Sequence, residues 1–224
     1  APQRSTMEKV LQDEIALVPN RLHLTLGSKL EHSDFAGAEV QPSARIAWTP
    51  SERQTFWGAV SRAVRTPSRG ERGFSIFGEP PNVLRPLPAV PLLIPFTGNP
   101  DFQSEELLAY EIGYRAQPHP RFSLDCTVFY HDYDDLRSTI PLPLELRLSP
   151  VPYLAFLATV NNDLYGESYG TEISARWQPL DAWRLRAAYS FLGLQLHARG
   201  PVRSLTEIDE GLNPQQQLAL WSDL

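Results

Sequence analysis

The sequence predicts an all-β protein, an antiparallel up-and-down meander that forms part of a transmembrane β-barrel. The first observation behind this prediction is a period-two alternation of apolar and polar residues, which is clearest over residues 105–136. The second is that short and long connections alternate along the chain. Outer-membrane barrels combine both features, because their strands have one apolar and one polar face and their turns are short at one end only.

The segment 105–136 contains two alternating stretches joined by a proline-containing turn at residues 117–120. Successive side chains of a strand point to opposite faces, so one face is apolar and aromatic while the other carries charges in mid-strand. Such a sheet requires oil on one side and a polar compartment on the other. The residues expected to face lipid, in this segment and in a later strand, are Leu108, Tyr110, Ile112, Leu124, Val128, Leu185 and Tyr189.

We expect about nine strands, each paired with its neighbour in sequence. The strands predicted outside the central segment cover residues 7–17, 22–31, 40–48, 55–64, 165–177, 183–191 and a final stretch from 215. A helix is the alternative for residues 7–17, because Leu11, Ile15 and Val18 also have helical spacing. An odd number of antiparallel strands leaves the two terminal strands parallel, so we expect an open sheet with unpaired edges.

The connections support this topology. Short turns follow Leu17, Trp48, Ala116 and Trp177, and each contains a proline. The long connections cover residues 65–104, 138–162 and 197–214, and the prolines in the first of them predict that it holds no regular element. Aromatic residues gather near the short turns, as in an interfacial girdle, at Trp48, Tyr114, Phe122, Trp177 and Trp183.

Composition excludes several other classes of protein. No run of about 18 apolar residues is present, which excludes a helical membrane span. The formal net charge of -6 argues against a nucleic-acid partner. The single cysteine, Cys126, cannot form an internal disulfide, and its place on the apolar face suggests a small buried hydrophobic residue.

Several segments, in this order and spacing, resemble the barrel portion of a TonB-dependent outer-membrane receptor. They are residues 11–14, 24–29, 61–68, 104–115, 129–136 and 169–172. The resemblance implies a barrel of about 22 strands that is plugged by an N-terminal domain. It also implies uptake powered through the inner-membrane TonB complex and a location in the outer membrane of a Gram-negative bacterium.

Under this resemblance, residues 1–224 form a partial barrel domain, and the plug domain, TonB box and C-terminal closing strands are missing. The implied partners are the TonB complex, reached through the missing N-terminal region, outer-membrane lipid, and a small-molecule metal chelate as ligand. No cofactor, no resident metal and no nucleic acid are expected, and the chain is not expected to be an enzyme.

Two sets of site residues follow. Aromatic residues of the long connections are candidates for ligand contact, with packing between loops as the alternative: Phe74, Phe77, Phe96, Tyr153 and Phe156. Charged residues of the polar faces are candidates for lining the lumen, with pairing across strands or with the plug as the alternative: Arg45, Glu111, Arg115, Asp125, Glu172, Arg176, Arg184 and Arg186.

Other chemical motifs have simpler interpretations. Residues 166–170 match the G-x-S-x-G elbow of α/β-hydrolases, but an alternating strand follows where the elbow requires a helix. The acidic run 131–135 lacks the glycine and terminal glutamate of a calcium loop and reads as a polar strand end. The five histidines show no metal-ligand spacing.

Three functions remain in competition. The first is energised uptake of a scarce nutrient, either a ferric siderophore or another metal complex. The second is a passive porin or a structural outer-membrane barrel. The third is a soluble β-rich enzyme or binding module, which the mid-strand charges opposite an aromatic apolar face disfavour.

Overall fold

The computed structural model describes residues 6–34, 36–73, 75–76, 92–93, 96–147, 153–155, 158–199 and 211–224. Nine long strands form one antiparallel meander in which each strand pairs with its neighbour along this path. They are β1 (Thr6–Val18), β2 (Leu22–Ser33), β3 (Gly37–Ser51), β4 (Gln54–Arg65), β8 (Glu105–His119), β9 (Phe122–Pro141), β12 (Ala158–Leu180), β13 (Trp183–Ala198) and β14 (Gln216–Asp223). The prediction of an antiparallel meander is therefore confirmed, including strand rather than helix at residues 7–17.

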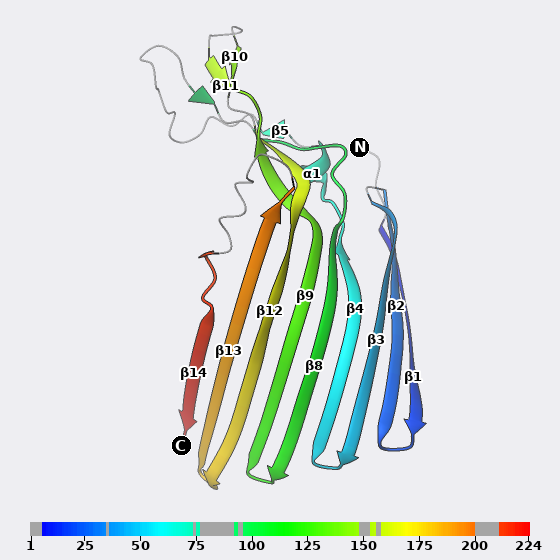
Figure 1. The fold of residues 1–224 in the computed structure, drawn as a ribbon, viewed down its shortest axis with the longest axis vertical. Coiled ribbons are helices and arrows are strands. Elements are labelled where there is room, and N and C mark those ends of the chain that lie inside the picture. The colour runs from blue at the N-terminus through cyan, green and yellow to red at the C-terminus, as the bar shows by residue number, and fades with distance from the viewer. Residues whose placement is uncertain are drawn as a thin grey trace.

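The meander is an open sheet. β1 and β14 lie at its two opposite edges, and no pairing joins them in the described part of the chain (Figure 1). The four short turns lie together at one end, here called the turn end, and α1, β5, β10 and β11 lie at the other, here called the loop end (Figure 1). No helix among the described residues is long and apolar enough to span a membrane.

The long connections contain more regular structure than the sequence predicted. They hold α1 (Arg69–Gly73), β5 (Ser75–Ile76), β6 (Leu92–Leu93), β7 (Phe96–Thr97), β10 (Glu145–Arg147) and β11 (Tyr153–Ala155). The expectation of no regular element in residues 65–104 was thus wrong for α1, β5, β6 and β7, whereas β10 and β11 lie in the next long connection. β5, β6 and β7 pair with segments distant in sequence, as β7 does with β12, and such pairing leaves no local periodicity.

The register assigns every predicted lipid-facing residue to one side of the sheet. Ile112 lies opposite Val128, and Ile173 bridges Cys126 on β9 and Tyr189 on β13. Residues directly opposite one another on paired strands share a face. This apolar face is not a buried core, since the side chain of Ile112 is 63 % exposed. The few fully buried residues, such as Phe102 and Val160, lie in the loop-end segments instead.

The turn end repeats one arrangement three times. The N–H of Thr49 donates to the carbonyl of Arg21 at 2.7 Å, that of Gln117 to Arg53 at 2.8 Å, and that of Gln178 to Arg121 at 2.8 Å. Each donor directly precedes a proline at which the strand pairing shifts register. Of the prolines assigned to turns from the sequence, Pro50, Pro118 and Pro179 therefore lie in strand bulges, where a missing N–H breaks no ladder bond, whereas Pro19 and Pro120 lie in turns.

The loop end has one interruption in the sheet. β3 and β4 pair from the turn end only as far as Ser43 and Ser61. Beyond this point side chains replace the ladder: Arg62 Nη1 donates to the Val40 carbonyl at 2.6 Å, and the N–H of Val64 donates to Gln41 Oε1 at 3.3 Å. The two strands stay connected there through side chains rather than through backbone pairing.

Candidate functional site

The polar face of the sheet is the first candidate surface. The register assigns all eight charged residues predicted to line a lumen to this face: Arg45, Glu111, Arg115, Asp125, Glu172, Arg176, Arg184 and Arg186. The face opposite to them is the apolar face described above. The eight residues come from five strands, β3, β8, β9, β12 and β13, and their role as lumen residues stays a prediction.

Five of these eight charged residues have a partner among the described residues, and for Glu111 the partner is His131, 3.8 Å away. Arg115 Nε donates to Asp125 Oδ2 at 2.5 Å, and Arg186 Nη2 donates to Asp223 Oδ2 at 3.1 Å. The guanidinium of Arg45 lies 4.5 Å from the centre of the Trp57 ring. A Cβ at Gly113 would clash with this ring, so glycine opposite Trp57 lets the indole lie flat along the strands.

A hydrogen-bonded cluster of side chains lies on the same face nearer the loop end. The hydroxyls of Tyr133 and Ser168 are 3.2 Å apart, and each lies 3.4 Å from His131 Nδ1. His131 Nε2 is 3.8 Å from Glu111 Oε1 and has no hydrogen-bond partner. The cluster joins β8, β9 and β12 and could hold a polar group of a bound molecule.

Ser168 is the serine of the G-x-S-x-G motif, and its surroundings exclude the elbow. It lies in the interior of β12, paired opposite His131 on β9 and Leu194 on β13. The backbone N–H groups of such a strand serve the ladders, so they are not free to form an oxyanion hole. The interpretation of residues 166–170 as part of a strand is confirmed.

The loop end holds a second candidate site around Glu71, a side chain that the sequence analysis did not single out. Residue Glu71 is 6 % exposed. Its Oε2 accepts from the N–H of Ser68 at 2.9 Å and from Arg65 Nη1 at 3.1 Å, and its Oε1 accepts from Arg65 Nη2 at 2.9 Å. The N–H of Glu71 in turn donates to Ser68 Oγ at 3.3 Å. This reciprocal pair is a capping box, whose S-x-x-E signature was readable at residues 68–71.

Electrostatics favour the ionised form of Glu71. Burial acts to raise its pKa, but hydrogen bonds from Arg65 and Ser68 outweigh burial and lower the pKa to about 2. Arg137 approaches Glu71 Oε1 at 3.5 Å, and the Glu71 carbonyl accepts from the N–H of Asn99 at 2.7 Å. Glu71 thus ties together the ends of β4 and β9 through its carboxylate and the segment before β8 through its carbonyl.

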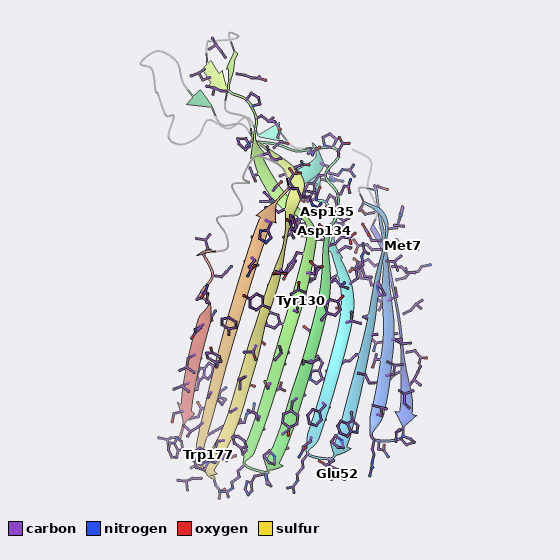
Figure 2. All side chains as sticks on the ribbon, viewed as in Figure 1. Met7, Glu52, Tyr130, Asp134, Asp135 and Trp177 are labelled. Atoms are coloured by element: carbon purple, nitrogen blue, oxygen red, sulfur yellow. The ribbon has the colours of Figure 1, made fainter. Side chains whose placement is uncertain are left out.

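The acidic run 131–135 does not converge on one point. Alternation along β9 separates His131 and Tyr133 from Asp132 and Asp134. Asp134 and Asp135 pair instead with Arg199, with 2.7 Å between Arg199 Nη1 and Asp135 Oδ1. Figure 2 shows both aspartates at the loop end, while Trp177 lies at the turn end and Tyr130 between them. The described residues contain no group of three or more His, Cys, Asp or Glu able to hold a metal ion.

The aromatic candidates for ligand contact stay predictions. Phe74, Phe77 and Phe156 lie outside the described residues. Phe96 falls in β7 and Tyr153 in β11, both in the loop-end segments. The structure therefore assigns two of the five to the end where ligand contact was expected.

The sequence matches the family model described as TonB dependent receptor-like, beta-barrel, over residues 5–223. No protein of curated function matches the sequence.

Solved structures similar to this sheet include receptors for iron complexes. A mutant of the ferric enterobactin receptor PfeA from Pseudomonas aeruginosa superimposes with a TM-score of 0.67 at 18% identity, over 84% of this chain and 26% of that protein. The siderophore receptor PirA from Acinetobacter baumannii gives 0.63 at 16%, over 85% and 28%. The FrpB iron transporter from Neisseria meningitidis gives 0.56 at 15%, over 88% and 28%. At these identities the likeness concerns the fold, and this chain spans about a quarter of each of these proteins.

Proposed function

The chain belongs to the family of TonB-dependent receptor-like β-barrels, and from this we propose that it forms part of the wall of an outer-membrane receptor that takes up a ferric siderophore or another metal complex. Uptake is energised through the TonB complex rather than passive. The family is one of Gram-negative outer membranes, and we place this chain there. Its function is that of a receptor and transporter, not of an enzyme.

The observation that carries this proposal is the separation of the two faces. An exposed apolar face spans the long strands, and eight charged residues share the opposite face. The apolar face suits lipid and the charged face a polar lumen. The similar structures are described as a ferric enterobactin receptor, a siderophore receptor and an iron transporter. These descriptions favour an iron complex as the ligand here.

Each region of the molecule has its own role in this function. Residues 1–224 contribute a partial barrel, and the plug, the TonB-contacting segment and the remaining strands lie in other parts of the same protein. Ligand contact belongs to the loop end, where Phe96 and Tyr153 lie in short strands. The charged residues of the polar face line the lumen.

Uptake of labelled iron tests the proposal. The intact protein is expressed in a Gram-negative strain that lacks its own siderophore receptors, and ⁵⁵Fe is supplied as a ferric tricatecholate or ferric hydroxamate. We expect saturable uptake that disappears when TonB is deleted. Uptake that persists without TonB would identify a passive porin, and absence of uptake with every iron complex tried would contradict the choice of ligand class.

The membrane orientation has its own test. Val128→Arg puts a charge on the apolar face and is expected to lower the unfolding free energy of the intact barrel in lipid by about 2–4 kcal/mol. Thr127→Arg puts the same charge on the polar face of the same strand and is expected to cost less. Both are measured by urea unfolding in vesicles, and equal costs would remove the argument for a lipid-facing surface.

A further inference from the structure

The negative charge of the molecule is concentrated at the loop end. The described segments nearest this end are residues 6–9, 29–34, 36–39, 62–73, 97–106, 132–147, 158–167 and residue 199. They hold fourteen Asp and Glu against nine Lys and Arg. The remaining described residues, from the middle of the strands to the turn end, hold eight of each and are balanced. A molecule that approaches the loop end therefore meets an acidic surface.

A cavity of about 550 Å³ at the loop end collects part of this negative charge. Four carboxylates line it, those of Glu39 on β3, Asp101, Glu106 on β8 and Asp135 on β9, together with one arginine, Arg72 of α1. Sites for small molecules in proteins commonly have volumes of about 300–1,000 Å³. The cavity is thus large enough for a small ligand, and we call it the acidic cavity.

Two of the four carboxylates share one counter-charge. Arg62 Nη2 lies 2.6 Å from Glu106 Oε1 and 3.5 Å from Glu39 Oε2. One guanidinium therefore serves two carboxylates.

The other two carboxylates differ in their partners. Asp135 pairs with Arg199 at 2.7 Å, but Arg199 also pairs with the adjacent Asp134. The N–H of Asp101 donates to Asn99 Oδ1 at 2.9 Å, and the carboxylate of Asp101 forms no ion pair within the described segments. Asp101 is therefore a lining carboxylate that is open to an external cation.

The arginines near the cavity do not neutralise it. Arg62, Arg72 and Arg199 face five carboxylates, the four of the lining and that of Asp134. Arg72 Nε donates to the carbonyl of Pro100 at 2.7 Å. The adjoining network contains two acidic and two basic residues, so it adds no net charge: Glu71, Glu105, Arg65 and Arg137. The acidic cavity keeps an excess of negative charge.

Ser104 supplies a second, uncharged contact in the acidic cavity. The residue lines the cavity and is 8 % exposed, and its hydroxyl has no hydrogen-bond partner among the described residues. Buried side-chain polar atoms in folded proteins nearly always have such a partner. The hydroxyl of Ser104 is therefore available to a bound molecule.

The charge of an iron complex depends on its chelating groups. Three catecholate dianions around Fe³⁺ leave a trianionic complex, whereas three hydroxamate monoanions leave a neutral one. A hydroxamate complex that also carries a free ammonium group is cationic. An acidic surface attracts cations and repels anions before contact, and a carboxylate accepts strong charge-assisted hydrogen bonds from an ammonium group.

We propose that the acidic cavity binds the ammonium group of a cationic ferric hydroxamate, with Asp101 as its anion and Ser104 as a hydrogen-bond acceptor. The loop end disfavours ferric tricatecholates. The ligand meets this end first, because the short turns of outer-membrane barrels lie on the periplasmic side. The inference rests on the proposed function, which it narrows to one class of iron complex.

Binding of three iron complexes to the intact receptor tests the inference. The first is a linear ferric trihydroxamate with a free ammonium group, the second is the same complex with that amine acetylated, and the third is a ferric tricatecholate. Each is labelled with ⁵⁵Fe and bound to cells that lack TonB, so that binding is measured without uptake. We expect the acetylated complex to bind about tenfold more weakly than the ammonium complex, the effect of losing one hydrogen bond to a charged group. The tricatecholate should bind most weakly.

Two variants then locate the ammonium site. Asp101→Asn keeps the shape and removes the charge, so it should abolish most of the preference for the ammonium complex and leave the acetylated complex unaffected. Ser104→Ala should reduce the same preference about fivefold, because a bond to an uncharged group contributes less. The matched control is Asp181→Asn, at the turn end with a side chain 91 % exposed, and it should change no affinity. Heat-dependent gel mobility shows that each variant forms a barrel.

The outcomes separate this inference from the proposed function. Tightest binding of the tricatecholate, or equal affinity for the two hydroxamate complexes, would overturn the inference and leave uptake of iron complexes standing. A preference that is unchanged in Asp101→Asn or in Ser104→Ala would overturn it as well. Failure of all three complexes to bind to a receptor that forms a barrel would instead contradict the proposed function.

Discussion

Neighbouring segments are joined by different kinds of contact at the turn end and at the loop end of the sheet. At the turn end, the residue before a proline donates to the carbonyl of an arginine in the preceding turn, at Thr49, Gln117 and Gln178. At the loop end, ion pairs between side chains supplement the backbone bonds of the short strands, and each ion pair has its own arrangement. Glu71 joins Arg65 and Arg137, and Arg199 joins Asp134 and Asp135.

The difference teaches how each end can vary. A backbone hydrogen bond does not depend on the side chain, so the turn end tolerates substitution provided that the N–H and the bulge persist. A buried carboxylate depends on its own charge and on each partner, so the loop end is sensitive to single changes. Binding residues commonly lie on loops that a rigid scaffold positions. Here the turn end belongs to the scaffold and keeps its backbone bonds, while the loop end changes with its side chains.

The largest effect is expected from removing the charge of Glu71. Glu71→Gln keeps the shape but loses the ion pair with Arg65, at a cost of about 2–3 kcal/mol, at the low end for a buried pair because Arg65 keeps Glu105. Hydrogen exchange of residues 66–73 and 97–102 in the intact protein measures this local loss. Glu52→Gln, at an exposed turn (Figure 2), is the matched control and should leave these amides unchanged. Equal amide protection in Glu71→Gln and Glu52→Gln would show that the Glu71 carboxylate does not stabilise the loop end.

Acid should reproduce part of that loss. The pKa of Glu71 is about 2 in the folded chain, below its ordinary value of 4.5, so ionisation stabilises the fold above pH 4.5. This contribution fades as the pH falls from 4.5 through about 2. Amide protection around α1 should therefore decrease with acid in the natural protein. In Glu71→Gln the decrease should be smaller, because residue 71 no longer titrates. Identical pH profiles would contradict the assignment.

A smaller effect is expected from the turn-end backbone. Thr49→Pro removes the N–H that donates to Arg21 and should cost about 1–1.5 kcal/mol in the unfolding free energy of the intact barrel. Thr49→Val keeps the N–H and loses only the 3.3 Å hydroxyl contact with Thr55, so its cost should be clearly smaller. Urea titration in vesicles measures both, and comparable costs would mean that the backbone bond contributes little.

The smallest effects concern the arginine side chains of the turns. Arg121 donates to the Pro179 carbonyl at 3.3 Å and to Asp181 at 2.7 Å, whereas Arg53 donates only to the Pro118 carbonyl at 3.3 Å. Exposed contacts of this kind contribute about 0–1 kcal/mol each. Alanine substitution should therefore cost most at Arg121, less at Arg53 and almost nothing at Arg21, measured by the same unfolding assay. A reversed order would show that these side-chain contacts do not determine the cost.

Sequence reasoning captured the long strands because alternation records which face each residue occupies. The shared face of Ile112 and Val128, and that of the charged residues, follow from that period. It assigned Pro50, Pro118 and Pro179 to turns because proline usually ends a strand, and it could not see that a bulge accommodates each one. The contacts of Arg137 with Glu71 and of Arg199 with Asp135 join segments that are distant in sequence, so a local periodicity cannot predict them. Glu71 itself had a local signature, the capping box, that was overlooked.

The repeated bond at the turn end also bears on how such a wall can grow. The β3–β4 and β8–β9 hairpins each present one carbonyl to the next hairpin and offer one N–H to the one before, so the joint is the same at all three places where it occurs. A duplicated hairpin would carry both halves of the joint with it and could be inserted without altering its neighbours. Gene duplication would then enlarge the wall two strands at a time, which keeps the strand number even, as bacterial barrels require.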